Sequence, residues 1–355
     1  MPQERLLNEL ERLIRRDPAR RGLIATEEQR GPLCPGHLGQ AATDLAENGK
    51  RAIIVTGFYI PSATPPAAET DGPPGAAMLA AALTSLGMVV EIVTDPRCHN
   101  AVKVAATSMH LPEETVICLG ESTSNIDQWF RRNVAETSRP PLTHLIAIER
   151  VGPSHTRDTI SRRIATTHSD SAGTDHKSPS DEAFDLAEFD RLVPESTWNH
   201  CHNMRGICLD EFTSPLHRLF ELADDHESIA TIGIGDGGNE IGMGSIRWRE
   251  IQERLSSPAV AHIPCRIKTD WTIVAGVSNW GGMALAAATL VLRNQHDVMK
   301  TWTSQQQLRL LEQLVEQGPA VDGITRLAEA TVDGLPFLTY IQPWEGIRRA
   351  AGFNN

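Results

Sequence analysis

The residues with the clearest potential for chemistry lie in the stretch 231–244, which contains six glycines in fourteen positions. Glycine at that density is tolerated where a backbone turns sharply or approaches a ligand closely. The same stretch carries Asp236, Asn239 and Glu240, whose carboxylate and amide oxygens suit a hard divalent cation such as Mg²⁺, Mn²⁺ or Ca²⁺. The pattern favours a loop that binds a metal or a polar substrate.

The glycine spacing also allows a second interpretation, because Gly233, Gly235 and Gly238 match the GxGxxG pattern of dinucleotide-binding loops. Such loops present backbone N–H groups to a pyrophosphate, and the charges of Asp236 and Glu240 would repel that group unless a cation lay between them. A purely structural glycine turn is the third interpretation. Of the three, we favour the metal or polar-substrate loop.

A second pair of acids, Glu69 and Asp71, lies in the segment 58–75, which contains five prolines and two glycines. In an extended chain, residues two positions apart point to the same side, so both carboxylates would face one site. A helix is expected to begin directly after this segment. The alternative is a surface turn with solvated acids, since Asp-Gly-Pro is common turn chemistry.

Other polar residues also follow apolar runs of strand type. Glu149 comes directly after the run 144–148, and Ser278 and Asn279 follow the run 271–277. In open α/β sheets, ligands bind in the crevice outside the carboxyl ends of the strands. These three residues are therefore candidates for the same site.

Three further segments invite functional interpretations. Arg205, in the sequence Asn-Met-Arg-Gly at 203–206, offers a forked donor for a carboxylate, although a surface arginine at a turn is equally compatible. The basic segment 15–22 could face an anionic ligand, but we favour the interpretation as a solvated helix end. The His-Cys-His sequence at 200–202 suggests zinc, but adjacent ligands without a second pair at zinc spacing make a closed site improbable.

Strand-type runs alternate with helical patterns along the chain, which indicates an α/β fold with a mostly parallel sheet. Strands are expected at 51–57, 89–94, 115–119, 144–148, 228–232 and 271–277, and helices at 3–16, 76–86, 100–108, 126–136, 246–255, 283–292 and 304–316. We expect a single three-layer α/β/α domain over 1–355, with a polar loop or lid over 154–195.

This fold class predicts that distant acids meet. Glu69, Asp71, Asp236 and Glu240 all lie at predicted strand-to-helix junctions, which gather at one edge of a parallel sheet. We therefore expect these side chains to converge although up to 171 positions separate them.

Composition restricts the partners. A net charge of -12 and a pI near 5.5 argue against nucleic acid and an anionic membrane surface, because both attract basic patches. The six cysteines are scattered without a C-x-x-C pair, which fits a reduced, cytoplasmic setting, and the apolar stretches are broken or too short to span a bilayer. We expect a small-molecule substrate and leave a homo-oligomer open.

Six segments together match one known pattern: Thr-Gly-Phe at 56–58, Glu-Thr-Asp-Gly-Pro-Pro-Gly-Ala at 69–76, Glu-Arg-x-Gly-Pro at 149–153, Asn-Met-Arg-Gly at 203–206, the glycine-acid stretch 233–244, and Gly-Val-Ser-Asn-Trp-Gly-Gly at 276–282. Over about residues 5–345 the chain resembles the D-glutamate cyclase-like C-terminal domain family, which forms the C-terminal part of the mitochondrial enzyme and occurs alone in prokaryotes. The resemblance implies an α/β fold, an acidic metal-binding cleft and cyclisation of D-glutamate to 5-oxo-D-proline with loss of water.

Lactam formation requires a base for the amine and a Lewis acid for the carboxylate, and the candidate residues divide between these roles. The metal ligands would be Glu69, Asp71, Asp236, Asn239 and Glu240; the substrate-binding residues Arg205, Asn203, Ser278, Asn279, Gly237 and Gly238; and the catalytic residues Glu149, Asp236 and Arg205. In this scheme Arg205 clamps the α-carboxylate and Glu149 takes the amine's proton. The alternatives are a metal-dependent hydrolase or phosphatase acting on a small molecule, and a non-catalytic ligand-binding domain.

Overall fold

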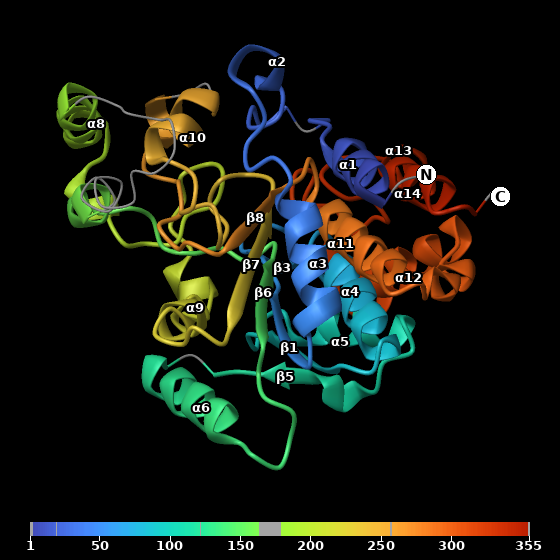
Figure 1. Ribbon diagram of the computed structural model, residues 1–355. Helices are drawn as coiled ribbons and strands as arrows, with labels where there is room; N and C mark the ends of the chain where they lie inside the picture. The colour runs from blue at the N-terminus through green and yellow to red at the C-terminus, as the bar shows by residue number, and fades with distance from the viewer. Residues whose placement is uncertain (1–2, 19, 121, 163–178, 256–257, 354–355) are drawn as a thin grey trace.

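A six-stranded parallel sheet forms the centre of the molecule in the computed structural model, which describes residues 3–18, 20–120, 122–162, 179–255 and 258–353 (Figure 1). The strands are β1 (Arg51–Thr56), β4 (Val89–Thr94), β5 (Val116–Cys118), β6 (His144–Ile148), β7 (Ala230–Gly235) and β8 (Trp271–Val274). Their order is β5-β4-β1-β6-β7-β8, and every neighbouring pair is parallel. The expected parallel sheet is confirmed.

Helices cover both faces of this sheet, because side chains along each strand alternate between two apolar layers. Ile54 packs with one layer of helices (α1, α3, α4, α5, α11, α12 and α14), whereas Ile53 packs with the other, which includes α6, α9 and α10. The helices span α1 (Gln3–Ile14), α2 (Glu27–Arg30), α3 (His37–Asn48), α4 (Pro73–Ser85), α5 (His99–Ser108), α6 (Thr123–Ala135), α8 (Pro179–Leu192), α9 (Arg218–Ala223), α10 (Trp248–Arg254), α11 (Ser278–Leu292), α12 (Ser304–Gln317), α13 (Phe337–Tyr340) and α14 (Gln342–Ala350). The three-layer α/β/α architecture is confirmed.

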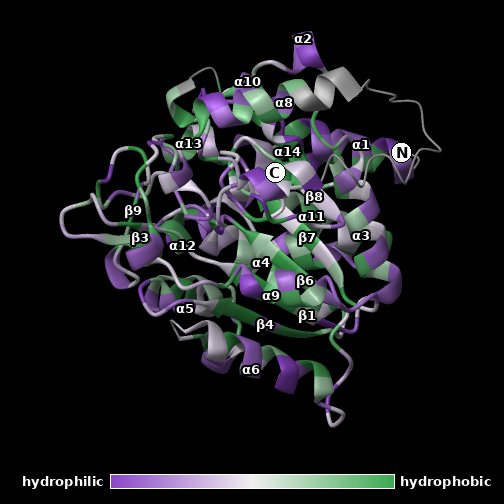
Figure 2. Cartoon of the chain, turned by 90° about the vertical axis from the view of Figure 1, so that its left-hand side faces the viewer, coloured by the Kyte–Doolittle hydropathy of each residue, from purple (hydrophilic) through white to green (hydrophobic). Residues whose placement is uncertain are grey.

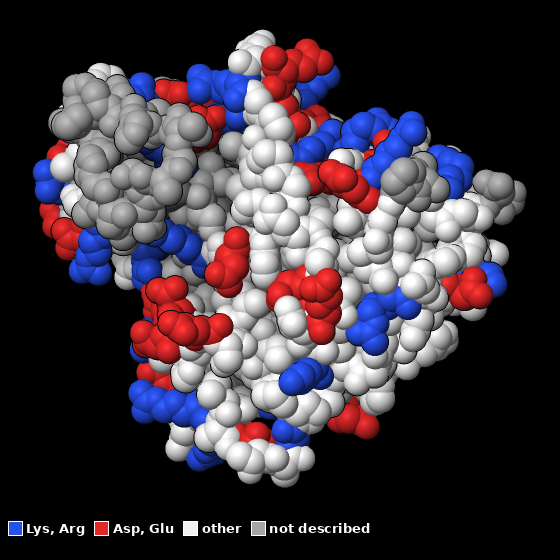
Figure 3. Space-filling model, in the orientation of Figure 1, with Lys and Arg blue, Asp and Glu red and all other residues white. Residues whose placement is uncertain are grey.

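Hydropathy follows this layering. In Figure 2 the central strands are hydrophobic, whereas outer helices such as α6 carry hydrophilic residues. On the face in Figure 3, basic and acidic residues are interspersed, and the described atoms there form no continuous basic surface. Within the described residues, no helix combines the length and apolarity that crossing a bilayer requires.

A second, three-stranded sheet was not expected from the sequence. It consists of β2 (Tyr59–Ile60), β3 (Ala67–Glu69) and β9 (Ala320–Val321). Its strands have only two or three residues and, unlike β5, do not lie within a longer apolar run that a pattern could reveal. This sheet orders the proline-rich connection between β1 and α4, and it places Glu69 at the end of β3.

The expectation of a polar loop throughout 154–195 is wrong for α8. This helix is polar overall, but its residue Phe189 is buried against Trp198 and Trp248, and Val193 just beyond it joins the same apolar cluster. Residues 163–178 lie outside the described part of the chain. Helix α3 was not expected either, although its buried residues recur with helical spacing.

Candidate functional site

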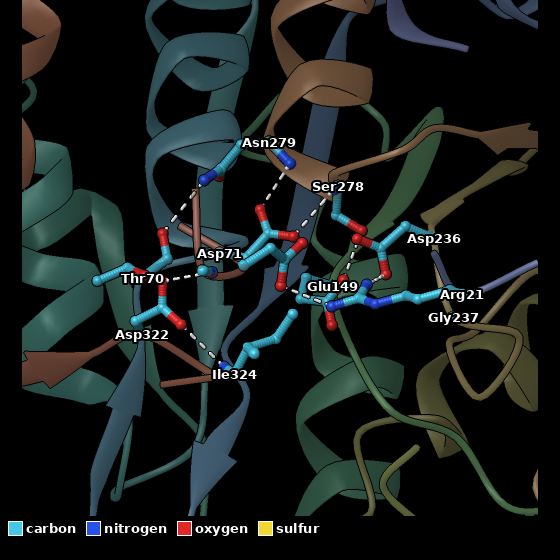
Figure 4. Close-up of polar contacts among 12 residues, drawn as sticks. Arg21, Thr70, Asp71, Glu149, Asp236, Gly237, Ser278, Asn279, Asp322 and Ile324 are labelled. Atoms are coloured by element: carbon cyan, nitrogen blue, oxygen red, sulfur yellow. Dashed lines mark hydrogen bonds and ion pairs between the residues drawn. The ribbon is translucent and has the colours of Figure 1, made fainter. Parts of the chain in front are cut away.

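Three buried carboxylates meet at the carboxyl ends of the central strands (Figure 4). Glu149 directly follows β6, Asp236 directly follows β7, and Asp71 precedes α4 in the long connection from β1. One carboxylate oxygen from each lies within 4.8 Å of the others. The structure thus brings together residues that are far apart in the sequence, as expected for junctions at one edge of a parallel sheet.

Asp71 is fixed by the first turn of α11. Its carboxylate accepts hydrogen bonds from the backbone N–H groups of Ser278 at 2.9 Å and Asn279 at 2.8 Å. In return, Asn279 Oδ1 accepts from the N–H groups of Gly72 at 3.0 Å and Gly75 at 2.8 Å. The beginnings of α4 and α11 therefore hold each other, and the positive end of the α11 dipole faces a carboxylate.

Ser278 and Asn279, expected as substrate-binding residues, are occupied within the protein. The Ser278 hydroxyl donates to Glu149 at 2.5 Å, and Asn279 Nδ2 donates to the Thr70 carbonyl at 3.1 Å. Both residues are fully buried. In this arrangement they position Asp71 and Glu149.

The glycine loop forms an anion cradle that its own Glu240 fills. The N–H groups of Gly237 and Gly238 each donate to the Glu240 carboxylate at 2.7 Å, and that of Asp236 donates at 3.2 Å. These are the donors that a pyrophosphate or a substrate would need. Gly233 lies inside β7, where a Cβ would approach the Cα of Gly242 to 2.5 Å, so its glycine serves close packing.

Arg21 supplies the positive charge of the cleft, which sequence reasoning missed. Its guanidinium forms ion pairs with Asp236 and Asp333, and its side chain is only 15% exposed. Asp17 accepts from the N–H groups of Arg21 and Gly22, both at 2.8 Å, which sets this turn. The interpretation of 15–22 as a solvated helix end is therefore wrong for Arg21, because its guanidinium is buried in ion pairs with two acids.

Two Asp-Gly turns near the C-terminus also reach the site. Asp333 forms an ion pair with Arg21. The Asp322 side chain accepts hydrogen bonds from three backbone N–H groups, those of Ile324 at 2.9 Å, Thr325 at 2.8 Å and Gly334 at 2.7 Å. Asp322 therefore shapes the loop. The sequence signal was limited to the common turn dipeptide Asp-Gly.

Burial controls the protonation of this cluster. It raises the pKa of Asp71 to about 8, with the charge of Asp333 adding to the effect. Burial also raises the pKa of Glu69 and Glu149 well above the usual carboxyl range, and neighbouring acids raise both further. Several buried carboxyls share Arg21 as their positive neighbour, and a charge excess of this kind favours binding of protons or a cation.

A cavity of about 200 Å³ opens onto the cluster, lined in part by Arg21, Glu69, Glu149, Asn203, Arg205 and Asn239. Arg205 is exposed at its rim and donates to the Ile324 carbonyl at 3.4 Å. The Asn203 side chain accepts from the N–H groups of Arg205 and Ile207, so it shapes the turn. Asn239 Nδ2 donates to the His202 carbonyl at 2.9 Å, and its buried Oδ1 has no donor among the described residues.

Comparison with known proteins identifies the family of this chain. The model of the family described as D-glutamate cyclase-like, C-terminal, matches residues 10–188 and 190–343. The human protein D-glutamate cyclase, mitochondrial, is 29% identical over 294 residues, which cover 81% of this chain and 39% of that protein. The chain thus spans about two fifths of the length of this relative. The family match covers nearly the whole fold and every element of the acidic cleft, and the chain belongs to the D-glutamate cyclase-like, C-terminal family.

Proposed function

We propose that this chain is a metal-dependent lyase that converts D-glutamate, or a closely related small amino acid, to 5-oxo-D-proline with loss of water. The observation that carries the proposal is the group of three buried carboxylates, Asp71, Glu149 and Asp236, of which Glu149 lines a small cavity. Membership of the family, and the activity named for the human relative, supply the reaction.

The three carboxylates have the chemistry of a divalent-cation site. Apart from its ion pair with Arg21, the buried carboxylate of Asp236 has no hydrogen-bond donor among the described residues. Arg21 is shared with several other buried carboxyls, and an excess of buried negative charge is costly unless further positive charge joins it. Mg²⁺, Mn²⁺ and Ca²⁺ all take carboxylate oxygens, so Asp71, Glu149 and Asp236 would hold the ion, which would polarise the side-chain carboxylate of the substrate.

This arrangement revises the roles first assigned from the sequence. Of the five expected ligands, Asp71 and Asp236 belong to the group of three carboxylates, and Glu149 joins them. Glu69, Asn239 and Glu240 lie outside this group, and Glu240 is bound by the N–H groups of its own loop. Glu149 belongs to the group of three carboxylates, and the Ser278 hydroxyl that it accepts holds its carboxylate in place. We therefore move Glu149 from amine base to cation ligand.

Glu69 is the carboxyl best placed for proton transfer. It lines the cavity, and burial raises its pKa, so that it binds a proton more strongly than an ordinary carboxyl does. Ring closure forms the C–N bond and breaks a C–O bond; the ammonium nitrogen loses two protons, and the departing oxygen gains two and leaves as water. Nitrogen and oxygen are attached to the same carbon during this exchange. One carboxyl can therefore take protons from the nitrogen and give them to the oxygen.

Arg205 would bind the α-carboxylate of the substrate. It is exposed at the cavity rim and can present two parallel donors to a carboxylate. The cavity of about 200 Å³ is smaller than the roughly 300–1,000 Å³ of sites for drug-sized ligands. A small dicarboxylic amino acid fits this charge pattern, with one carboxylate toward Arg205 and the other toward the cation.

The direct test is to incubate the purified chain with D-glutamate and Mn²⁺ and to follow 5-oxo-D-proline by chiral chromatography. We expect product from the wild type and from the control Asp127→Asn, which alters a surface ion pair, and none from Asp236→Asn. Phosphate release from phosphate esters that is lost in Asp236→Asn would establish the hydrolase alternative instead. Binding of D-glutamate without any product would indicate a ligand-binding domain.

A further inference from the structure

A short antiparallel ribbon beside the cavity carries a second group of metal-ligating side chains. Its two arms are joined by an isolated bridge between His202 and Cys208. The N–H of Leu209 donates to the Cys201 carbonyl at 2.7 Å, and that of Asn203 donates to the Ile207 carbonyl at 3.0 Å. This register places His200 opposite Asp210.

The alternation of side chains along a ribbon separates its residues into two sets. Cys201 and Leu209 occupy one face and are buried in an apolar cluster with Phe58 and Val151. His200, His202, Cys208 and Asp210 therefore share the opposite face. One arm therefore contributes the imidazoles of His200 and His202, and the other contributes the Cys208 thiol and the Asp210 carboxylate. All four groups come from this one ribbon.

Three of these side chains lie close to one another. One ligand atom each from His200, Cys208 and Asp210 lies within 4.8 Å of the others. His200 Nδ1 lies 2.5 Å from Asp210 Oδ2, and Asp210 Oδ1 accepts from the N–H of Cys201, which fixes that carboxylate. The side chains of His200 and Asp210 are 44% and 42% exposed, and Cys208 is exposed, so an ion can reach them from solvent.

His202 adds a second observation on the same face. Its side chain is buried, its ring packs edge-on against His262 with centroids 4.7 Å apart, and its buried Nδ1 has no hydrogen-bond partner among the described residues. A buried, unpaired imidazole nitrogen is costly.

We propose that this ribbon face binds a transition-metal ion of the Zn²⁺ type through His200, Cys208 and Asp210, with His202 lying behind them on the same face. Thiolate and imidazole ligands select such ions, whereas the all-oxygen cleft around Asp236 suits Mg²⁺, Mn²⁺ or Ca²⁺. Binding forms a metal–sulfur bond and releases the thiol proton to solvent. The proposal is independent of the reaction catalysed in the cleft.

The location gives the ion a structural consequence. The turn of this ribbon presents Arg205 to the cavity, and the His202 carbonyl accepts the hydrogen bond from Asn239 in the glycine loop. An ion that ties the two arms together would hold this turn in place. It would therefore order the turn that carries Arg205 while remaining outside the reacting centre.

The test uses Co²⁺ as a spectroscopic probe in the full chain with the Asp236→Asn substitution, which weakens the oxygen site. We expect one equivalent of Co²⁺ with a sulfur-to-metal charge-transfer band, displaced by one equivalent of Zn²⁺. Cys208→Ser should abolish the band, whereas the control Cys118→Ser, which alters another exposed cysteine, should retain it.

Alkylation followed by mass spectrometry gives an independent readout on the wild-type chain. Zn²⁺ should protect Cys208 from iodoacetamide at least tenfold and leave the rate at Cys118 unchanged. A band of equal intensity in Cys208→Ser, or equal alkylation of Cys208 with and without Zn²⁺, would overturn the proposal. Neither readout depends on cyclase activity, so failure here is distinguishable from failure of the proposed function.

Discussion

Asp71 and Asn279, 208 positions apart in the sequence, are joined by a hydrogen bond from the Asn279 N–H to the Asp71 carboxylate. The Asn279 side chain in turn accepts hydrogen bonds from the N–H groups of Gly72 and Gly75 at the beginning of α4. This reciprocal contact fixes the beginnings of two buried helices and aims Asp71 at Glu149 and Asp236. The acid cluster is therefore built on helix ends, and its geometry depends on a residue that need not touch substrate.

Asn279→Ala should destabilise the fold strongly. The substitution leaves the N–H of Gly75 buried without an acceptor, at a cost of about 1–3 kcal/mol, and it removes one of the two acceptors of the Gly72 N–H, which keeps its bond to Asp71. Urea denaturation measures the change. Asn100→Ala, which removes an exposed hydrogen bond to the Gln317 carbonyl, is the control and should cost about 1 kcal/mol or less. Equal losses in the two variants would contradict the role of Asn279.

A divalent cation should stabilise the folded chain. By mass action, a ligand at a hundredfold excess over its Kd adds about 2.7 kcal/mol to the free energy of unfolding. Thermal unfolding with Mn²⁺ and with a chelator measures this, and Asp236→Asn should reduce the difference. Asp127→Asn, on the surface of α6, should retain it. Identical melting temperatures with Mn²⁺ and with chelator would argue against an ion in the cleft.

Without a cation, stability should fall as pH rises from about 5 to 8. Burial raises the pKa of Asp71 to about 8. It also raises the pKa of Glu69 and of Glu149. The folded chain therefore keeps protons that the unfolded chain releases near pH 4. Because a cation replaces these protons, affinity for Mn²⁺ should rise over the same interval. Denaturation and titration at several pH values measure both, and a Mn²⁺ affinity independent of pH would be inconsistent with this account.

Arg205→Ala should raise KM for D-glutamate about 10- to 100-fold with a smaller change in kcat, because a two-bond contact to the α-carboxylate persists from ground state to transition state. Steady-state kinetics measure KM and kcat separately. Arg131→Ala, at a side chain that is 75% exposed on α6, is the matched control. A fall in kcat at constant KM would place Arg205 at the reacting atoms instead.

The sheet could be predicted because its strands are continuous apolar runs. The predicted boundaries of β4 and β6 match the structure residue for residue. The small sheet of β2, β3 and β9 could not be predicted, because its pairing depends on tertiary contacts between very short segments. Helix α8 was hidden by its polar composition, although Phe189 and Val193 mark an apolar face.

At the site, acids that directly follow strands could be located, because sheet topology alone gathers Glu149 and Asp236. Their hydrogen-bond partners could not be located. Residue spacing does not reveal that Glu240 fills its own loop or that Arg21 reaches Asp236 from the turn after α1. Such contacts follow from how loops fold over the sheet edge, and local pattern carries little information about that.

The most direct test of the central claim is anomalous diffraction from a crystal of the chain soaked in Mn²⁺. The account predicts a Mn²⁺ peak bonded to carboxylate oxygens of Asp71, Glu149 and Asp236, which already lie within 4.8 Å of one another. Ordered density for Mn²⁺ elsewhere, with these three carboxylates unchanged and unbound, would contradict it.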